Sequence, residues 1–380
     1  MYNQNIKNSI AFIVLNLQKL LFFISFPITL FFKKTNRTLI IGNETANLLH
    51  LYANIFDCFS INTARNKFYS NEYNLDFSKY PSIFRIIFLP ILFAIALRKF
   101  SSIWYFSSGS FFVPFKGRLW EFDKVKRSGS SLVCFFVGSD IRSLKLARNL
   151  SKELSLDHWS NYILKDMQNA VESSDKRSLE FSEAADNFSD HIFSVKNDQI
   201  SYIKNKIHML PTPVARNRFI NNHSKWNDLS RIRILHSPSA FHIKGTQIVT
   251  AAIKKLEEEG YVFTFDLLTD VSQKEVLERL DNAHFALNEF YAYCPGIFGV
   301  EAMEANCLLL TSASKELEPD LFGEPNNVWV RTPYYEIYDN LKYFLDHPQE
   351  AINIANNGTN WAREYCSKDA TYNYVKSIIE

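Results

Sequence analysis

Hydrophobic and polar positions divide the chain into two stretches in which short apolar runs alternate with amphipathic segments. In the first stretch, runs typical of buried strands occur at residues 37–43, 102–106, 131–140, 190–196 and 206–214. Apolar residues at helical spacing follow the first run over residues 44–56, and a polar helical region covers residues 143–187. Strands that alternate with helical segments indicate βαβ units and a mainly parallel sheet.

The alternation restarts after a polar, asparagine-rich segment at residues 215–231, which we interpret as a linker between domains. Strands are expected at residues 232–238, 261–269, 284–290, 307–312 and 328–332. Helices are expected at residues 245–260 and 272–283, and the tail from residue 334 also has a helical pattern. The sequence therefore predicts an α/β fold of two Rossmann-like domains facing across a cleft. Ligands are expected in that cleft, at the carboxyl ends of the strands.

Two long apolar segments, residues 9–32 and 84–100, carry basic residues at their ends. Polar residues inside the first segment argue against a signal peptide, and Lys19 would be costly at the centre of a bilayer. Three interpretations stay open: an apolar, base-rimmed surface that lies on a membrane, a single span near the N-terminus, or an ordinary buried core. In both membrane cases the basic residues place the bulk of the chain on the cytoplasmic side, and we expect a peripheral position at the inner (plasma) membrane.

Composition and charge narrow the function. The chain is 47% hydrophobic and 22% charged, which is typical of a globular protein, and its net charge of +2 gives no reason to expect nucleic acid as a partner. The five cysteines are odd in number and have no metal-ligand spacing. We therefore expect free thiols, a reducing compartment, and neither a metal site nor a disulfide framework.

Residues that suit an anionic ligand follow three of the strands predicted in the second stretch. Lys244 and Gly245 stand at the start of a predicted helix, where free N–H groups and a lysine suit a phosphate or diphosphate. Gly296 and Gly299 allow the backbone to approach a ligand closely. Glu301 is expected in the first turn of the next helix, where a carboxylate can accept two hydrogen bonds from a vicinal diol such as ribose.

Other candidate residues stand at the ends of predicted strands. In the second stretch these are His236, His242, Asn288 and Glu289. In the first stretch they are Gly42, Gly138, Asp140 and Arg142. Each has a structural alternative, because a histidine at a strand end is often only hydrogen-bonded to its neighbours and an aspartate often caps a turn.

Two segments carry a resemblance to a known family. "HSPSAFHIKGTQIVTAAIKKLEEEGYVFTFDLL" and "ALNEFYAYCPGIFGVEAMEANCLLLTS", within residues 235–313, resemble the donor-nucleotide half of GT-B fold glycosyltransferases of the large family-four group. "FFVGSDIR", residues 135–142, is similar to an element of the acceptor half. The resemblance implies nucleotide-sugar binding by the candidates of the second stretch and acceptor-side positions for those of the first.

The sequence also departs from the family pattern. The family's usual arginine before K-G-T is Phe241 here, and the first of its two glutamates is Tyr293, although Glu289 lies close by and could substitute. Val137 replaces an acceptor-side histidine, and Asn306 stands where a glycine is usual. The resemblance implies retention of anomeric configuration and no obligatory metal or other cofactor. It leaves the catalytic group unknown, with Asp140, Arg142 and Glu289 as candidates.

From these observations we expect a membrane-associating segment over residues 1–36, an acceptor-side domain over residues 37–215 and a nucleotide-sugar-binding domain over residues 216–365. The C-terminal helix over residues 366–380 could pack back on the acceptor-side domain. The expected function is transfer of a sugar from a nucleotide-diphosphate sugar to a lipid-linked or oligosaccharide acceptor at the inner leaflet, in the biosynthesis of a lipopolysaccharide, O-antigen or capsule. Two alternatives are a non-transferring enzyme such as a nucleotide-sugar epimerase, and a non-catalytic subunit of a polysaccharide assembly complex.

Overall fold

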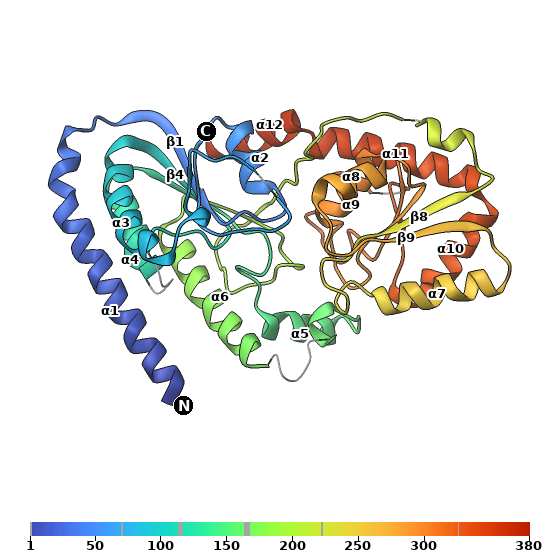
Figure 1. Cartoon of the computed structure of the whole chain (residues 1–380), viewed down its shortest axis with the longest axis horizontal. Coiled ribbons are helices and arrows are strands. Elements are labelled where there is room, and N and C mark those ends of the chain that lie inside the picture. Colours follow the sequence, from blue (N-terminus) through green and yellow to red (C-terminus); the bar gives the residue numbers. More distant parts are fainter. Residues whose placement is uncertain (1, 70, 113–116, 163–167, 222, 326) are drawn as a thin grey trace. The chain divides into compact units, whose positions relative to one another are not determined.

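The computed structural model describes residues 2–69, 71–112, 117–162, 168–221, 223–325 and 327–380 (Figure 1). The chain forms two compact units. The first unit comprises residues 1–143, 170–195 and 199–210, and the second comprises residues 144–169, 196–198 and 211–380. The described parts of residues 144–169, which include helix α5 (Leu144–Glu153) and the short helix η4 (Trp159–Tyr162), thus belong with the C-terminal half.

A seven-stranded parallel sheet forms the centre of the first unit, in the order β3-β2-β1-β4-β5-β6-β7. Its strands are β1 (Thr35–Gly42), β2 (Phe59–Asn62), β3 (Leu75–Asp76), β4 (Phe100–Phe106), β5 (Ser131–Phe135), β6 (His191–Ser194) and β7 (His208–Met209). The helices are α1 (Tyr2–Ser25), α2 (Leu48–Ile55), α3 (Ser82–Lys99), α4 (Arg118–Arg127) and α6 (Gln168–Phe188), with the short helices η1 (Phe26–Phe31) and η2 (Phe77–Lys79). The predicted parallel sheet is confirmed, and β2 and β3 are additional to the predicted strands.

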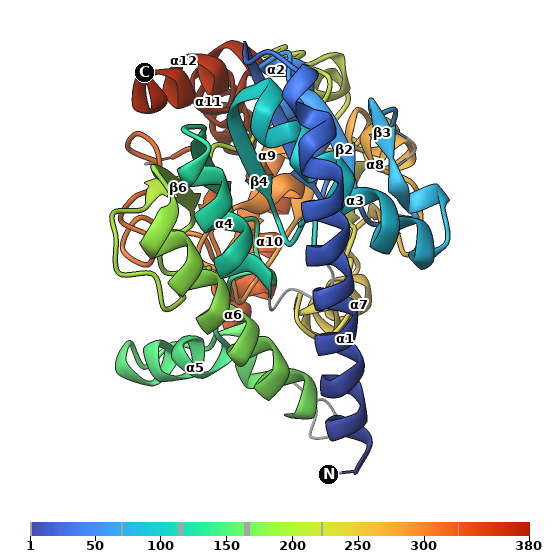
Figure 2. The ribbon, with the colours of Figure 1, turned by 90° about the vertical axis from the view of Figure 1, so that its left-hand side faces the viewer.

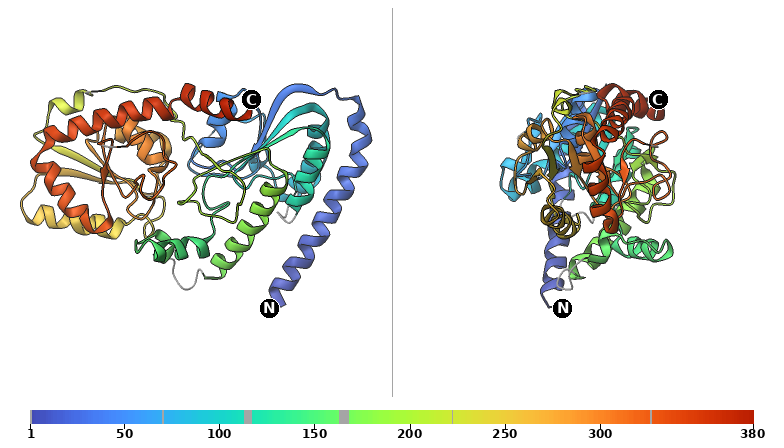
Figure 3. Two further views of the ribbon diagram at one scale, coloured as in Figure 1. Left: turned by 180° about the vertical axis from the view of Figure 1, so that it is seen from behind. Right: turned by 90° about the vertical axis from the view of Figure 1, so that its right-hand side faces the viewer.

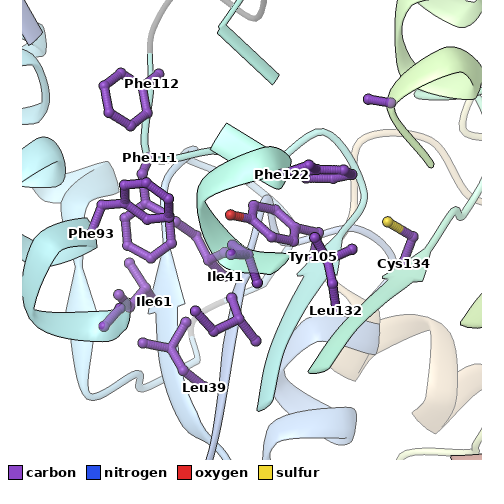
Figure 4. Close-up of a cluster of buried hydrophobic side chains, with 14 of the residues drawn as sticks. Leu39, Ile41, Ile61, Phe93, Tyr105, Phe111, Phe112, Phe122, Leu132 and Cys134 are labelled. Atoms are coloured by element: carbon purple, nitrogen blue, oxygen red, sulfur yellow. The ribbon is translucent and has the colours of Figure 1, made fainter. Parts of the chain in front are cut away.

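Both faces of this sheet are buried, which explains its continuous apolar strands. On one face, Phe93 of α3 and Phe122 of α4 pack in the cluster that also contains Ile41 and Tyr105 (Figure 4). Phenylalanines such as Phe93 and Phe122 therefore belong to the core, whereas others of the N-terminal half, such as Phe12 and Phe84, are exposed. Apolar side chains of α1 and α3 that point away from this cluster are exposed instead.

Helix α1 runs alongside α3 (Figure 2). Many of its apolar side chains, such as Phe12 and Phe23, are exposed. An inward stripe of Leu15, Gln18 and Phe22 is buried, whereas most of the large hydrophobic side chains exposed in the described part of the chain lie within residues 10–32 and 80–88. Residues 9–31 are long and apolar enough to cross a membrane, by length and composition.

A five-stranded parallel sheet, in the order β12-β11-β10-β8-β9, forms the centre of the second unit (Figure 3). The strands are β8 (Ile232–His236), β9 (Phe263–Leu267), β10 (Phe285–Leu287), β11 (Leu308–Thr311) and β12 (Val330–Arg331). The helices are α7 (Thr246–Glu258), α8 (Gln273–Leu280), α9 (Gly296–Glu304), α10 (Ile337–Asp346), α11 (Pro348–Cys366) and α12 (Lys368–Ile379), with the short helices η6 (Ser224–Asn227) and η7 (Tyr334–Glu336).

Alternation along the strands assigns the helices to opposite faces of this sheet. Leu287 and Leu310 pack in one cluster with residues of α7 and α10. Leu309 points the other way, and a Cβ placed on Gly299 of α9 would lie 3.3 Å from its Cδ2. Helices therefore cover both faces, and the predicted α/β fold with two Rossmann-like sheets is confirmed.

Candidate functional site

Lys244 and Glu289 form an ion pair at the carboxyl edge of the second sheet. Lys244 stands just before α7, whose N-cap Gly245 has φ 75°, and Glu289 follows β10. Gly296 begins α9 with φ 60°, and a Cβ placed on it would lie 3.5 Å from Oε1 of Glu289. The structure therefore brings Lys244, Gly245, Glu289 and Gly296 into one cluster, with the N-terminus of α9 beside the ion pair.

Asn288 and Gly299 fix the loop that leads into α9. The Asn288 amide donates to the carbonyl of Pro295, the residue before α9, and Asn288 is buried. A Cβ on Gly299 would lie 2.8 Å from Nδ2 of Asn288, so a larger residue would push against the amide that holds the loop. Pro295, the N-cap residue of α9, makes no side-chain cap hydrogen bond. The first N–H groups of a helix have no partner within the helix, so those of α9 suit an anion.

His236 is buried at the end of β8 with partners on both ring nitrogens. Nδ1 lies 2.8 Å from the carbonyl oxygen of Leu287, and Nε2 lies 2.9 Å from Oγ1 of Thr246, the first residue of α7. Burial lowers the pKa of His236 to about 4, and the hydrogen bond to Leu287 opposes that shift. The ring is therefore neutral and ties β8 to β10 and to the start of α7. Direct contact between His236 and a nucleotide stays a prediction, and this geometry favours an indirect role.

Glu301 lies in the second turn of α9, which corrects the expectation of a first-turn carboxylate. The helix starts at Gly296, so Glu301 lies beyond the first turn, where the partial positive charge of a helix N-terminus is strongest. Its side chain is buried, and burial raises its pKa to about 7. A hydrogen bond of 2.5 Å from Nε2 of Gln273 opposes that rise, and the charge of Glu304 adds to it.

Gln273 is a residue of this edge that the sequence did not reveal. It opens α8, directly after the N-cap Ser272, whose hydroxyl accepts from the N–H of Glu275. Its position after a predicted strand, at the same edge as the other candidates, could have pointed to Gln273. The sequence alone does not indicate that α8 brings its first residue to Glu301.

Three departures from the family pattern have distinct environments. Phe241 is exposed, as is His242 beside it, whose Nδ1 lies 3.5 Å from Nε2 of Gln247. Tyr293 is buried, its backbone N–H donates to Asp198, and burial raises its pKa to about 12. Asn306 has φ 59° at the end of α9, which is the left-handed conformation that glycine and asparagine adopt most readily.

In the first unit, Gly42 is required by close packing. A Cβ on Gly42 would lie 2.8 Å from Cβ of Phe106, and a Cβ on Gly109 would lie 2.3 Å from Cα of Gly42. Two loops, after β1 and after β4, therefore meet at this glycine.

The turn after β5 is closed by Asp140. Both of its carboxylate oxygens lie 3.2 Å from the backbone nitrogen of Val137, and the N–H of Arg142 donates to the carbonyl of Gly138. Asp140 is buried, and burial raises its pKa, although the backbone hydrogen bonds oppose that shift. Acceptor-side roles for Gly138, Asp140 and Arg142 stay predictions, and the geometry shows that Asp140 already caps its own turn.

We searched the described part of the chain for a possible metal site. No group of three or more His, Cys, Asp or Glu side chains there could hold a metal ion. None of the five cysteines forms a disulfide.

Comparison with known proteins adds evidence on the fold. No family model and no curated protein matches the chain. Among solved structures, WaaG, a glycosyltransferase involved in lipopolysaccharide biosynthesis, is 11% identical, with a TM-score of 0.57 over 91% of this chain and 100% of that chain. An alpha-glucosyltransferase solved with UDP and a 13-mer DNA is 11% identical, with a TM-score of 0.53 over the same shares of the two chains.

The chain has a GT-B fold. TarM is also similar, at 10% identity and a TM-score of 0.50, with 76% of this chain and 58% of TarM covered. The chain also spans 56% of the length of an S. aureus TarM mutant. At these identities the likeness shows the fold alone.

Proposed function

We propose that the protein is a glycosyltransferase that moves a sugar from a nucleotide-diphosphate donor to a glycan acceptor. The observation that carries this proposal is the cluster of Lys244, Glu289 and the uncapped start of α9 at the carboxyl edge of the second sheet. In open α/β sheets this edge is where nucleotides bind. A cation beside a free helix N-terminus suits a diphosphate, because both attract negative charge.

The donor half of the reaction follows from these groups. As the bond between sugar and diphosphate breaks, negative charge grows on the leaving phosphate. Lys244 and the N–H groups at the start of α9 would stabilise that charge, and Glu301 would hold the ribose. Glu289, paired with Lys244, lies where it can orient the transferred sugar. The structure of a similar enzyme, an alpha-glucosyltransferase, was solved in complex with UDP, which supports a nucleotide ligand.

We place the acceptor at a membrane surface. Exposed side chains such as Phe12, Phe23, Phe84 and Phe88 give the first unit an apolar face on α1 and α3. The first acidic residue of the sequence is Glu44, so the basic residues that precede it have no acidic neighbours in sequence. An apolar face with basic flanks suits peripheral attachment to an anionic leaflet and a lipid-linked glycan acceptor of the cell-surface polysaccharide kind.

The test is a mass-spectrometric screen of purified protein against nucleotide-diphosphate sugars, with and without vesicles that carry lipid-linked glycans. Release of nucleotide diphosphate with transfer or hydrolysis of one sugar supports the proposal. Lys244→Met should abolish release, and Lys254→Met, on an exposed turn of α7, should not change it. Conversion of the donor into an epimer would instead support a non-transferring enzyme.

One observation favours a second candidate, a non-catalytic subunit that binds a nucleotide. Tyr293 takes the place of a family glutamate, and its hydroxyl is buried with no hydrogen-bond partner among the described residues. Calorimetric binding of a nucleotide diphosphate, together with no turnover of any donor in the screen, would support this candidate over the transferase.

A further inference from the structure

Lys225 and Cys307 bring an amine into contact with a thiol in the second unit. Nζ of Lys225 lies 3.3 Å from Sγ of Cys307. The same nitrogen donates to the carbonyl of Leu280 at 3.2 Å and to that of Ala305 at 2.7 Å. Cys307 is buried, whereas Lys225 is partly exposed. The pair therefore lies at the margin of the core and not at its centre.

The contact is fixed by the way in which the segment around Lys225 docks on the turn before β11. Nε1 of Trp226 donates to the carbonyl of Asn306 at 2.9 Å, and the N–H of His223 donates to Oδ1 of Asn306 at 3.1 Å. Cys307 is the next residue of the same turn and stands directly before β11. Hydrogen bonds beside both reacting residues therefore keep the nitrogen near the sulfur, which favours a reaction between them.

The surroundings of the pair favour a neutral amine. Burial lowers the pKa of Lys225, and the acid whose charge opposes this shift, Asp281, is already paired with Arg216 at 2.6 Å. A neutral amine is a nucleophile. Burial raises the pKa of Cys307, although Lys225 opposes that rise. A thiol with a raised pKa is oxidised slowly, so we expect reaction on prolonged exposure to an oxidant.

We propose that hydrogen peroxide joins Lys225 to Cys307 through a reversible sulfur–nitrogen bond. Peroxide first transfers one oxygen to Sγ, which is oxidised to a sulfenic acid, and the other peroxide oxygen leaves as water. The neutral amine then attacks Sγ. The S–N bond forms, the S–O bond breaks, and the hydroxyl leaves with one amine proton as a second water. One thiol, one amine and one peroxide thus give a sulfenamide and two waters.

The crosslink would stabilise the second unit. Lys225 and Cys307 are 82 positions apart, so the bond closes a long loop that includes β8, β9 and β10. A link across a long loop removes more conformational freedom from the unfolded chain than a link across a short one. The inference does not depend on the proposed function, because neither residue belongs to the candidate donor site.

Peptide mass spectrometry of the full chain after prolonged treatment with hydrogen peroxide tests the inference. Wild type should yield two peptides joined at Lys225 and Cys307, with a mass lower by two hydrogens than the sum of the separate peptides. Dithiothreitol should restore the free thiol and the free amine. Peroxide should also shift the midpoint of thermal unfolding upward by several degrees relative to its effect on Lys225→Arg, and dithiothreitol should remove this difference.

Lys225→Arg keeps the positive charge but lacks the nucleophilic amine, and Cys307→Ser lacks the sulfur, so neither should form the crosslink. Cys366 is an internal control, because it is as deeply buried as Cys307 and burial alone raises the pKa of its thiol. It should form no bond to a lysine. Recovery of Cys307 from treated wild type only as a thiol, or only as a sulfinic or sulfonic acid, would overturn the inference. Equal crosslinking of Cys366 to lysines would also overturn it. These outcomes need wild-type protein alone, so they stand even where a variant fails to fold.

Discussion

The ammonium group of Lys244 forms an ion pair with the carboxylate of Glu289, and both side chains are about one fifth exposed. The pair joins the residue before α7 to the residues after β10 and lies beside the start of α9. In the absence of a nucleotide, the carboxylate therefore holds the cation that a diphosphate would need. The two halves of the ion pair should have opposite effects on binding.

Glu289→Gln should strengthen binding of a free nucleotide diphosphate, and Lys244→Met should weaken it. The first change removes a negative charge next to the phosphates and frees Lys244, which we expect to improve the free energy of binding by about 1 kcal/mol. The second removes the cation and should cost at least about 1.4 kcal/mol, or tenfold in Kd. Isothermal titration measures both. Glu316→Gln, which alters a mostly exposed carboxylate paired with Arg331, is the matched control. Weaker binding by Glu289→Gln would contradict this account.

Glu301→Gln should separate stability from binding. The folded-state pKa of Glu301, raised to about 7, lies above the ordinary glutamate value of 4.5. Its contribution to stability is therefore full below pH 4.5 and is lost as the pH rises through 7. Relative to wild type, Glu301→Gln should gain about 2–3 kcal/mol in free energy of unfolding between pH 5 and pH 8. It should also lose nucleotide affinity, by about 1–3 kcal/mol at pH 8, because an amide is a weaker acceptor than a carboxylate.

Denaturant unfolding at the two pH values and titration with nucleotide give the two quantities for Glu301→Gln. Glu275→Gln, in the first turn of the adjacent helix, controls for the loss of a charge. An unchanged dissociation constant would count against a ribose contact by Glu301, whatever happens to stability.

His236→Leu should destabilise the second unit and make it less sensitive to acid. The folded-state pKa of His236, lowered to about 4, lies below the ordinary histidine value of 6.5. The stability that depends on the neutral ring is therefore present above pH 6.5 and is lost as the pH falls towards 4. At pH 7 the variant should lose about 2 kcal/mol, because Thr246 and the carbonyl of Leu287 lose their partner.

Urea unfolding at pH 7 and pH 5 measures both parts of the His236 prediction. The difference in stability between wild type and His236→Leu should shrink at the lower pH, since only wild type must keep a buried ring unprotonated. His347→Leu, which changes an exposed histidine, should show no such convergence. A constant difference at the two pH values would refute the assignment of a neutral, buried ring to His236.

Periodicity predicted most of the second unit, because its strands are continuous apolar runs separated by amphipathic helices. The same rule failed at β2, where Ser60 and Asn62 interrupt the apolar pattern and yet are buried. Their polar atoms are satisfied by side chains that no local pattern specifies. Asn74 accepts from the backbone and hydroxyl groups of Ser60, and Asn62 donates to Asp76.

The candidate site was predictable as a set of loops but not as a set of contacts. Lys244 and Gly296 could be placed at helix starts from sequence, whereas the ion pair of Lys244 with Glu289 depends on how two βα loops pack. Asn306 stands where the family usually has a glycine. Its φ of 59° is a conformation that both glycine and asparagine adopt readily, and its side chain donates to Asn356 and Thr359, contacts that the sequence did not indicate.

The apolar face of α1 and α3 leads to the last prediction. Phe84 and Phe88 stack on one exposed side of α3, with ring centroids 5.8 Å apart, and each is less than half exposed. Burying two such rings in a bilayer should contribute about 1 kcal/mol or more for each ring. The double substitution Phe84→Glu with Phe88→Glu should therefore weaken binding to phosphatidylglycerol-containing vesicles at least tenfold, without unfolding the protein, because neither ring lies in the core.

Cosedimentation with vesicles measures this binding, and Tyr343→Glu with Tyr372→Glu, at two exposed aromatic positions of the second unit, is the matched control. Binding of wild type should fall as salt rises, because the basic residues around this face, including Lys33, Lys34 and Lys79, act by charge. A protein whose α1 spans the bilayer would stay with the membrane in high salt and despite both charged residues on α3. Release by either treatment therefore distinguishes attachment to the surface from a transmembrane anchor. We expect release, because α1 packs along one side against its own unit. Next to its inward stripe, the ammonium of Lys19 lies 5.4 Å from the ring centroid of Trp120. A helix held in this way along one side suits a position on the membrane surface.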